Sequence, residues 1–171
     1  MSRAQRVLQV LLVLLALLFT GGCGRSAPPV PFALSYATKD AAVEAFLVAL
    51  RARDRDTLAA QVVTETEFLK YVWPHLPASR PDVGMPADRA WADQAQKNDL
   101  FLTQTLAEHG GRRYDLLAAS FDGSATAYES FTIHPKTRLD IREGFEVREV
   151  RLFGSMIESG GRWKIYSFVV D

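Results

Sequence analysis

The spacing of apolar residues changes near residue 112, and this change most restricts what the chain can fold into. Before that point, apolar side chains recur every three or four residues, which is typical of amphipathic helices. After it, short segments rich in β-branched and aromatic residues are separated by turn residues. Helices followed by an antiparallel sheet are the order of an α+β domain, and we therefore expect that fold class.

The helical half contains recognisable start and stop signals. Thr38 has the position of an N-cap, and Thr64 and Glu67 have the spacing of a capping box. A longer helix is expected over residues 87–108, where Gly110 supplies the stop. The first helix is expected to bury one apolar stripe, formed by Val43, Phe46, Leu47 and Leu50.

The sheet half ends in a hairpin whose register is set by the two-glycine turn at residues 160–161. This turn aligns Met156 with Ile165 on one face and Ser155 with Tyr166 on the other. Both faces are largely apolar, so one is expected to pack on the helices while the other needs a second cover. We expect that cover to be a second copy, in a homodimer formed through the outer sheet face.

The order of elements resembles the nuclear-transport-factor-two-like superfamily, whose fold is cystatin-like α+β. The resemblance rests on N-terminal helices, on Ala-Val-x-x-Phe-Leu-x-x-Leu at residues 42–50, and on Gly-Arg-Trp-Lys-Ile-Tyr-Ser-Phe at residues 161–168. It implies N-terminal helices packed in the concave face of a strongly bent, cone-like antiparallel sheet, often with a pocket. It implies no particular reaction, because this fold hosts isomerases, dehydratases and pure binding modules.

The first 22 residues have the pattern of a signal peptide. Arg3 and Arg6 precede an apolar run over residues 10–19, about half of the roughly 20 residues that a membrane-spanning helix needs. Thr20-Gly21-Gly22-Cys23 then resembles the bacterial lipobox, which implies cleavage before Cys23 and lipidation of its sulfur. The family usually has leucine in place of Thr20, so ordinary signal-peptidase cleavage remains an alternative.

Cleavage divides the chain into three expected parts. Residues 1–22 form the signal peptide, residues 23–37 the lipidated cysteine with a proline-bearing tether, and residues 38–171 a single α+β domain. The chain has one cysteine, so no disulfide stabilises the domain. We expect attachment to a bacterial membrane in the cell envelope. Because Gly24 rather than an aspartate follows Cys23, the periplasmic face of the outer membrane is favoured, with the inner membrane as the alternative.

The nearly neutral net charge argues against a nucleic-acid partner. Loss of Arg3 and Arg6 leaves 18 basic and 20 acidic residues, from 20 of each in the whole chain. A nearly neutral domain is not typical of nucleic-acid binding. The histidines lack metal-ligand spacing, so we expect neither a metal nor a cofactor.

Three aromatic residues are the candidates for ligand binding. Tyr71 and Trp73 come just before Pro74 and His75 on a rigid turn, and Trp91 lies on the long helix. Such clusters rim pockets in many proteins. The alternatives are that Trp73 and Leu76 fasten the loop to the core with His75 in solvent, and that Trp91 is a core residue.

Glu129 and His75 are the candidates for a general base. Glu129, Phe131 and Ile133 are spaced two residues apart, so a strand here would place the Glu129 carboxylate on an otherwise apolar sheet face, an environment suited to general-base chemistry. The alternative is that Tyr128, Ser130 and Thr132 form the outer row of the sheet. Glu129 would then simply meet Arg138 or Arg142 across strands.

No sequence pattern of a known catalytic class accompanies these residues. There is no G-x-S-x-G, no H-E-x-x-H and no phosphate-binding glycine loop. We therefore expect an envelope lipoprotein that binds a small apolar ligand or an envelope protein. The alternatives are a pocket enzyme of the isomerase or hydratase kind and a structural assembly subunit.

Overall fold

The first helix begins where the sequence predicts it. In the computed structural model, which describes residues 27–170, Thr38 Oγ1 accepts a hydrogen bond from Ala41 N at 3.1 Å and caps α2 (Lys39–Ala52). The predicted apolar stripe of α2 is buried. The predicted signal peptide and Cys23 lie outside the described residues.

The remaining helices follow with short connections. Thr64 and Glu67 form the predicted capping box, in which Glu67 Oε2 accepts from Thr64 N at 2.8 Å. The helical elements that follow α2 are α3 (Arg55–Gln61), α4 (Glu65–Glu67), η1 (Phe68–Val72), η2 (Trp73–His75), η3 (Pro77–Ser79) and α5 (Ala87–His109).

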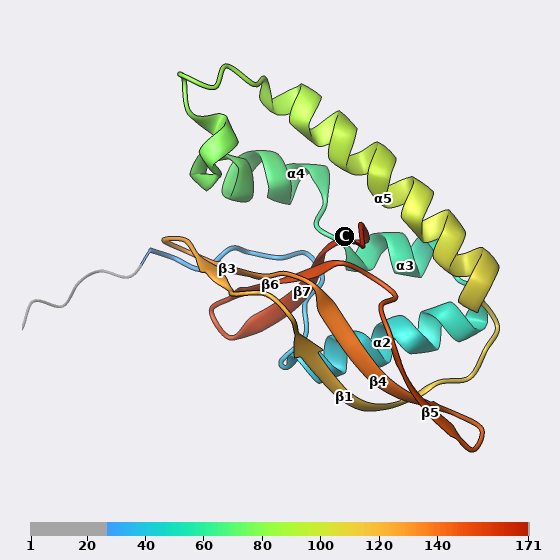
Figure 1. Cartoon of the computed structure of the whole chain (residues 1–171). Helices are drawn as coiled ribbons and strands as arrows, with labels where there is room; N and C mark the ends of the chain where they lie inside the picture. The colour runs from blue at the N-terminus through green and yellow to red at the C-terminus, as the bar shows by residue number, and fades with distance from the viewer. Residues whose placement is uncertain (1–26, 171) are drawn as a thin grey trace, which may run out of the picture.

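The strands confirm the α+β class and divide into two antiparallel sheets, neither of which closes into a barrel (Figure 1). Sheet β1-β4-β5 consists of β1 (Asp115–Phe121), β4 (Thr137–Glu143) and β5 (Glu146–Val150). Sheet β2-β3-β6-β7 consists of β2 (Thr126–Ala127), β3 (Thr132–His134), β6 (Ser155–Ser159) and β7 (Arg162–Ser167).

Gly154 joins the two sheets. Its carbonyl accepts from Thr137 N of β4 at 2.8 Å, and its N–H donates to Ser167 O of β7 at 3.0 Å. A Cβ at this position would come within 1.7 Å of Val169 O, so only glycine allows this approach of the backbones.

The register of the last hairpin is as predicted near the turn and differs beyond it. Met156 pairs with Ile165, but Ser155 pairs with Ser167, so the predicted pairing of Ser155 with Tyr166 is wrong. The register shift leaves Tyr166 as an extra residue in β7. The shift turns Phe153 and Phe168 toward the core around Phe46, with ring centroids 5.0 and 6.1 Å from Phe46.

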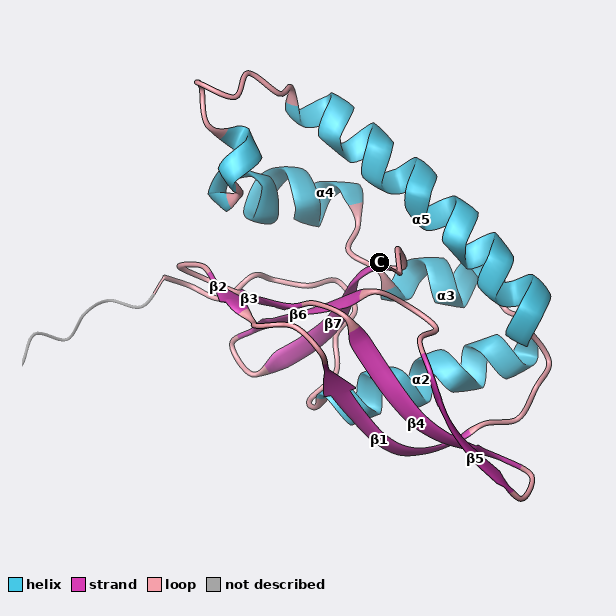
Figure 2. Cartoon of the chain, in the orientation of Figure 1, coloured by secondary structure: helices cyan, strands magenta, loops and turns pink. Residues whose placement is uncertain are grey.

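The β6–β7 hairpin lies between α2 and the segment that contains α4 (Figure 2). An apolar core packs against each of its faces. Met156 and Ile165 pack in the first core, which includes the stripe of α2. Ile157 packs in the second core, together with Phe68 of η1. Within residues 27–170 both faces of this hairpin are therefore covered by the chain itself, so the hairpin does not supply the uncovered apolar face that we expected, and the homodimer stays a prediction.

The N-terminal segment is docked on the domain. Val30 is buried and its N–H donates to Ser159 Oγ at 2.8 Å. Tyr36 and Trp163 exchange two backbone hydrogen bonds of 2.9 and 2.8 Å. Residues 30–37 thus belong to the domain, which corrects the expected tether over residues 23–37. The backbone of this segment pairs with β7 through an isolated antiparallel bridge between Tyr36 and Trp163.

A buried ion pair connects the N-terminal segment, α4 and β7. Lys164 Nζ lies 3.0 and 2.8 Å from the two carboxylate oxygens of Glu67, and the residues are 0% and 3% exposed. Glu67 Oε1 also accepts from Ala33 N at 2.7 Å. Burial alone would raise the pKa of Glu67, but the bonds from Lys164, Thr64 N and Ala33 N outweigh it and hold that pKa below its usual value.

We expect Glu67→Gln to lower the free energy of unfolding by about 3–5 kcal/mol at pH 7, because it leaves Lys164 buried without its counter-charge. In the native chain, the part of the free energy of unfolding that comes from ionised Glu67 should be lost as pH falls through the lowered pKa of Glu67. Glu67→Gln should not show this decrease. Urea unfolding at several pH values measures both. Asp93→Asn, which removes the exposed pair with Lys97, is the control and should cost less than about 1 kcal/mol. Equal acid sensitivity in the native chain and Glu67→Gln would contradict this account.

We expect Gly154→Ala to destabilise the domain by roughly 3 kcal/mol or more, because Val169 and its backbone must move. Gly144→Ala is the matched control. Gly144 has φ +62° with nothing within 4 Å of an added Cβ, so the left-handed backbone alone should cost about 1 kcal/mol. Thermal unfolding of the two variants compares the effects, and similar losses would argue against a tight junction at Gly154.

Candidate functional site

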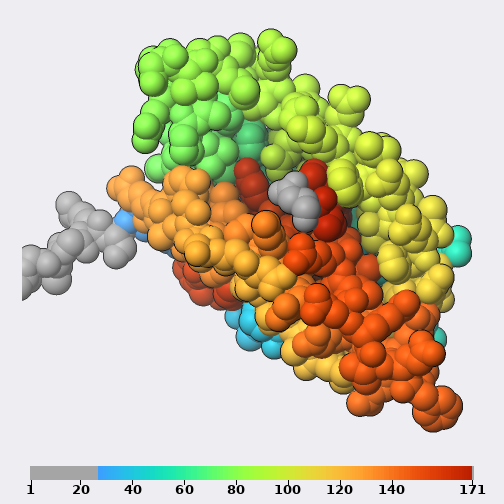
Figure 3. Space-filling view, viewed as in Figure 1, coloured from blue at the N-terminus to red at the C-terminus, as the bar shows by residue number. Residues whose placement is uncertain are grey.

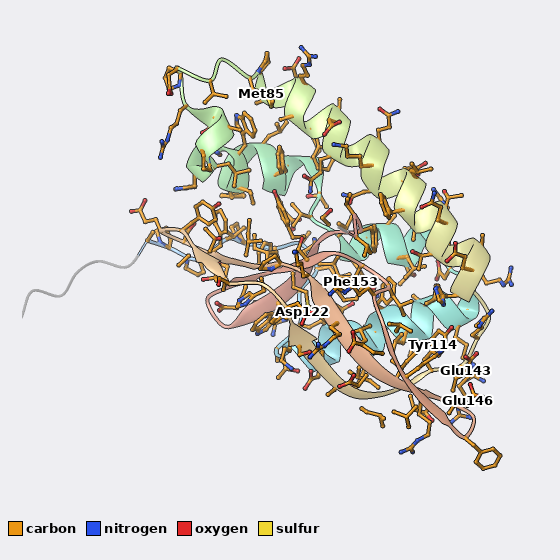
Figure 4. The ribbon with its side chains drawn as sticks, viewed as in Figure 1. Met85, Tyr114, Asp122, Glu143, Glu146 and Phe153 are labelled. Carbon is orange, nitrogen blue, oxygen red and sulfur yellow. The ribbon has the colours of Figure 1, made fainter. Side chains whose placement is uncertain are left out.

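A cavity of about 360 Å³ lies between the start of α5, the η1–η2 segment and β7 (Figure 3). We call it the α5 cavity. Met85, labelled in Figure 4, lies just before the first turn of α5 and contributes to its lining. The lining residues are Phe68, Trp73, Leu76, Met85, Arg89, Ala90, Asp93, Gln94 and Tyr166.

Aromatic rings form the inner wall of the α5 cavity. The ring centroid of Phe68 lies 5.9 Å from that of Trp73 and 5.5 Å from that of Trp91. Trp91 lines a neighbouring hollow of about 210 Å³ under the same helix. The structure therefore brings the sequence candidates Trp73 and Trp91 together around Phe68.

The polar groups of the α5 cavity come mainly from one face of α5. Asp93 pairs with Lys97 at 2.8 Å, and Gln94 Nε2 donates to Tyr166 O at 3.2 Å. Arg89 has no ion-pair partner within residues 27–170. The guanidinium of Arg89 is thus the available charge of the α5 cavity.

Tyr166 supplies a neutral phenol to the α5 cavity. Burial, and next the nearby Tyr128, raise the pKa of Tyr166 to about 12, against the lowering effect of a hydrogen bond with Gln94. At neutral pH this side chain therefore remains protonated and does not act as a base.

Arg89, Gln94 and Tyr166 are site residues that the sequence did not predict. A signal for the α5 face was present, because Arg89, Ala90, Asp93 and Gln94 recur at helical spacing and so lie on one side of α5. No comparable signal pointed to Tyr166, since its orientation depends on the register shift in β7.

A second depression, which we call the N-terminal groove, brings Tyr71, His75 and Glu129 together. Its volume is about 310 Å³, and its lining residues are Ala27, Pro28, Pro29, Val30, Lys70, Tyr71, His75, Glu129 and Ser130. Three sequence candidates thus share one groove, which lies beside the N-terminal segment rather than within the α5 cavity.

Glu129 does not have the environment that either sequence interpretation required. It lies between β2 and β3, in a turn closed by a 2.8 Å hydrogen bond from Tyr128 N to Phe131 O, and it is exposed. The expected burial on a sheet face is therefore absent. The expected pairing is also absent, since Arg138 pairs with Asp122 and Glu149.

His75 is exposed as well. Its ring meets the edge of Phe131 at a centroid distance of 5.8 Å, while Trp73 is buried and Leu76 packs on the second core. This arrangement agrees with the interpretation in which Trp73 and Leu76 fasten the loop.

A third depression, of about 440 Å³, lies between α2 and β1 and has a mixed lining of charged and apolar residues that includes Tyr114. Tyr114 Oη lies 2.9 Å from His109 Nδ1 and accepts from Arg148 at 3.2 Å. Arg148 also donates to Glu143, near Tyr114 in Figure 4. Burial lowers the pKa of His109. This network ties the end of α5 to sheet β1-β4-β5.

Among residues 27–170, no group of three or more histidine, cysteine or acidic side chains is placed to hold a metal ion. None of the helices in this range has the length and apolar character needed to cross a membrane.

Comparisons of this chain with models of known protein families, with curated proteins and with solved structures found no match. The resemblance to the nuclear-transport-factor-two-like superfamily therefore remains a prediction.

Proposed function

We propose that this chain is an envelope lipoprotein, anchored to a bacterial membrane through Cys23, whose domain binds a small and mainly apolar ligand in the α5 cavity. The observation that carries the binding proposal is that Phe68 and Trp73 line the same cavity as Arg89, whose guanidinium has no ion-pair partner within residues 27–170. The anchor is supported by the lipobox-like sequence at residues 20–23.

The lining of the α5 cavity indicates the class of ligand. Its volume of about 360 Å³ falls in the range of small-molecule sites, roughly 300–1,000 Å³. Aromatic and aliphatic side chains favour an apolar body, and Arg89 favours a carboxylate or phosphate at one end. We therefore propose an apolar ligand with one acidic group.

The two alternative functions have less support. A pocket enzyme needs Glu129 or His75 in a closed cavity, whereas both side chains are exposed on the N-terminal groove. A purely structural subunit would have no use for the α5 cavity.

Lipidation is tested by the mass of the N-terminal peptide of the mature chain. We expect Cys23 to begin the mature protein and to carry a diacylglycerol, and Cys23→Ala to remove the protein from the membrane fraction. Thr20→Leu, which restores the usual lipobox residue, should leave the modification intact and serves as the positive control. A mature chain with an unmodified Cys23 thiol would contradict the anchor.

Ligand binding is tested with the mature chain carrying Cys23→Ala, titrated with a fluorescent fatty acid. We expect Ala90→Phe, which fills the α5 cavity, to weaken binding by at least about tenfold. Ala92→Phe is the matched control, because Ala92 is exposed on α5 and does not line the cavity. Arg89→Gln should weaken the binding free energy of the fatty acid by about 1.5–3 kcal/mol and should change that of its methyl ester little. Equal affinities of Ala90→Phe and Ala92→Phe would reject the α5 cavity.

A further inference from the structure

The place where the N-terminal segment meets the domain restricts how the anchored domain can sit on the membrane. Ala27, Pro28, Pro29 and Val30 all line the N-terminal groove, and Val30 is fixed to Ser159 Oγ at 2.8 Å. Four peptide units separate Cys23 from Ala27, and fully extended chain of this length spans at most about 14 Å.

The following step rests on the proposed anchor at Cys23. Each head-group region of a bilayer is roughly 5–8 Å thick, from the difference between the hydrocarbon core and the whole membrane. A reach of about 14 Å from a lipidated cysteine therefore keeps Ala27 within or just above the head groups. The N-terminal groove, which begins at Ala27, then opens beside the bilayer surface.

The side chains of the N-terminal groove suit that surface. Lys70 Nζ lies 5.1 Å from the ring centroid of Tyr71, which gives a cation beside an amphipathic ring. Tyrosine and lysine are both favoured at the membrane interface, where the polar end meets head groups. Within residues 27–170, neither Lys70 nor Glu129 has an ion-pair partner, so both charges are available to a head group.

We propose that the N-terminal groove is the membrane-facing surface of the domain and receives phospholipid head groups from the bilayer that holds the anchor. Lys70 contacts the lipid phosphate, and Tyr71 lies at the level of the head groups. Glu129 faces the amine of a zwitterionic head group.

The opposite end of the molecule provides an internal reference. Figure 1 shows the described chain beginning beside the β2–β3 hairpin, while the β4–β5 hairpin projects from the far end. Phe145 at the tip of that hairpin is fully exposed. On this proposal the β4–β5 hairpin points away from the bilayer.

The orientation is tested with the lipidated protein in phosphatidylethanolamine–phosphatidylglycerol vesicles that contain a phospholipid with a nitroxide on its head group. A fluorophore is attached to Ser130→Cys in the groove or, as the matched control, to Phe145→Cys. We expect at least twofold stronger quenching at position 130 than at position 145. Equal quenching at the two positions would overturn the proposal.

Intact mass separates failure of the orientation from failure of the anchor. A lipidated Cys23 has no free thiol, so the native chain should take up no label, and labelled native chain would reject the proposed anchor itself. Equal quenching with a fully lipidated chain rejects only the groove.

A lengthened tether distinguishes binding of head groups from mere proximity to the bilayer. Twelve Gly-Ser residues inserted after Gly24 allow the domain to leave the surface. We expect quenching at position 130 to persist in this protein and to fall at least twofold when Lys70→Glu is added. Quenching that is lost on insertion alone would overturn the binding of head groups by the groove.

Discussion

The carboxylate of Glu67 is the point at which three parts of the domain meet. It accepts hydrogen bonds from Lys164 of β7, from Ala33 of the N-terminal segment and from Thr64 of its own capping box. A charge so deeply buried persists only when its partners satisfy it, and here both oxygens are used. Because each bond comes from a different segment, the pair stabilises one relative placement of the three.

That placement also decides what covers the β6–β7 hairpin. Lys164 and Ile157 are paired neighbours on the face opposite Met156, and the α4–η1 segment lies over them. The sheet face that we predicted to need a second cover is therefore covered by η1 and by Val30. The apolar surface that remains most exposed is Phe145, at the end of the β4–β5 hairpin.

Local signals in the sequence were sufficient to predict the helices and insufficient to predict the candidate site. The caps at Thr38 and Thr64 depend on side chains a few residues away, so the sequence predicts them correctly. The register shift beside Tyr166 accompanies the packing of Phe168 on Phe46, a contact between distant parts of the chain that no local pattern predicts. The exposure of Glu129 likewise follows from a turn that interrupts residues 126–134, a segment that alternates like one strand.

The same pair connects the two proposed surfaces of the molecule. Phe68, which forms a wall of the α5 cavity, directly follows Glu67, and Tyr166 follows Lys164 by two residues. Ala33, which bonds the same carboxylate, lies three residues beyond Val30 of the N-terminal groove. A displacement of the N-terminal segment therefore acts on Glu67 through Ala33 and on the second core through Val30. Membrane contact and ligand binding are thus expected to influence each other through these two buried contacts of the N-terminal segment.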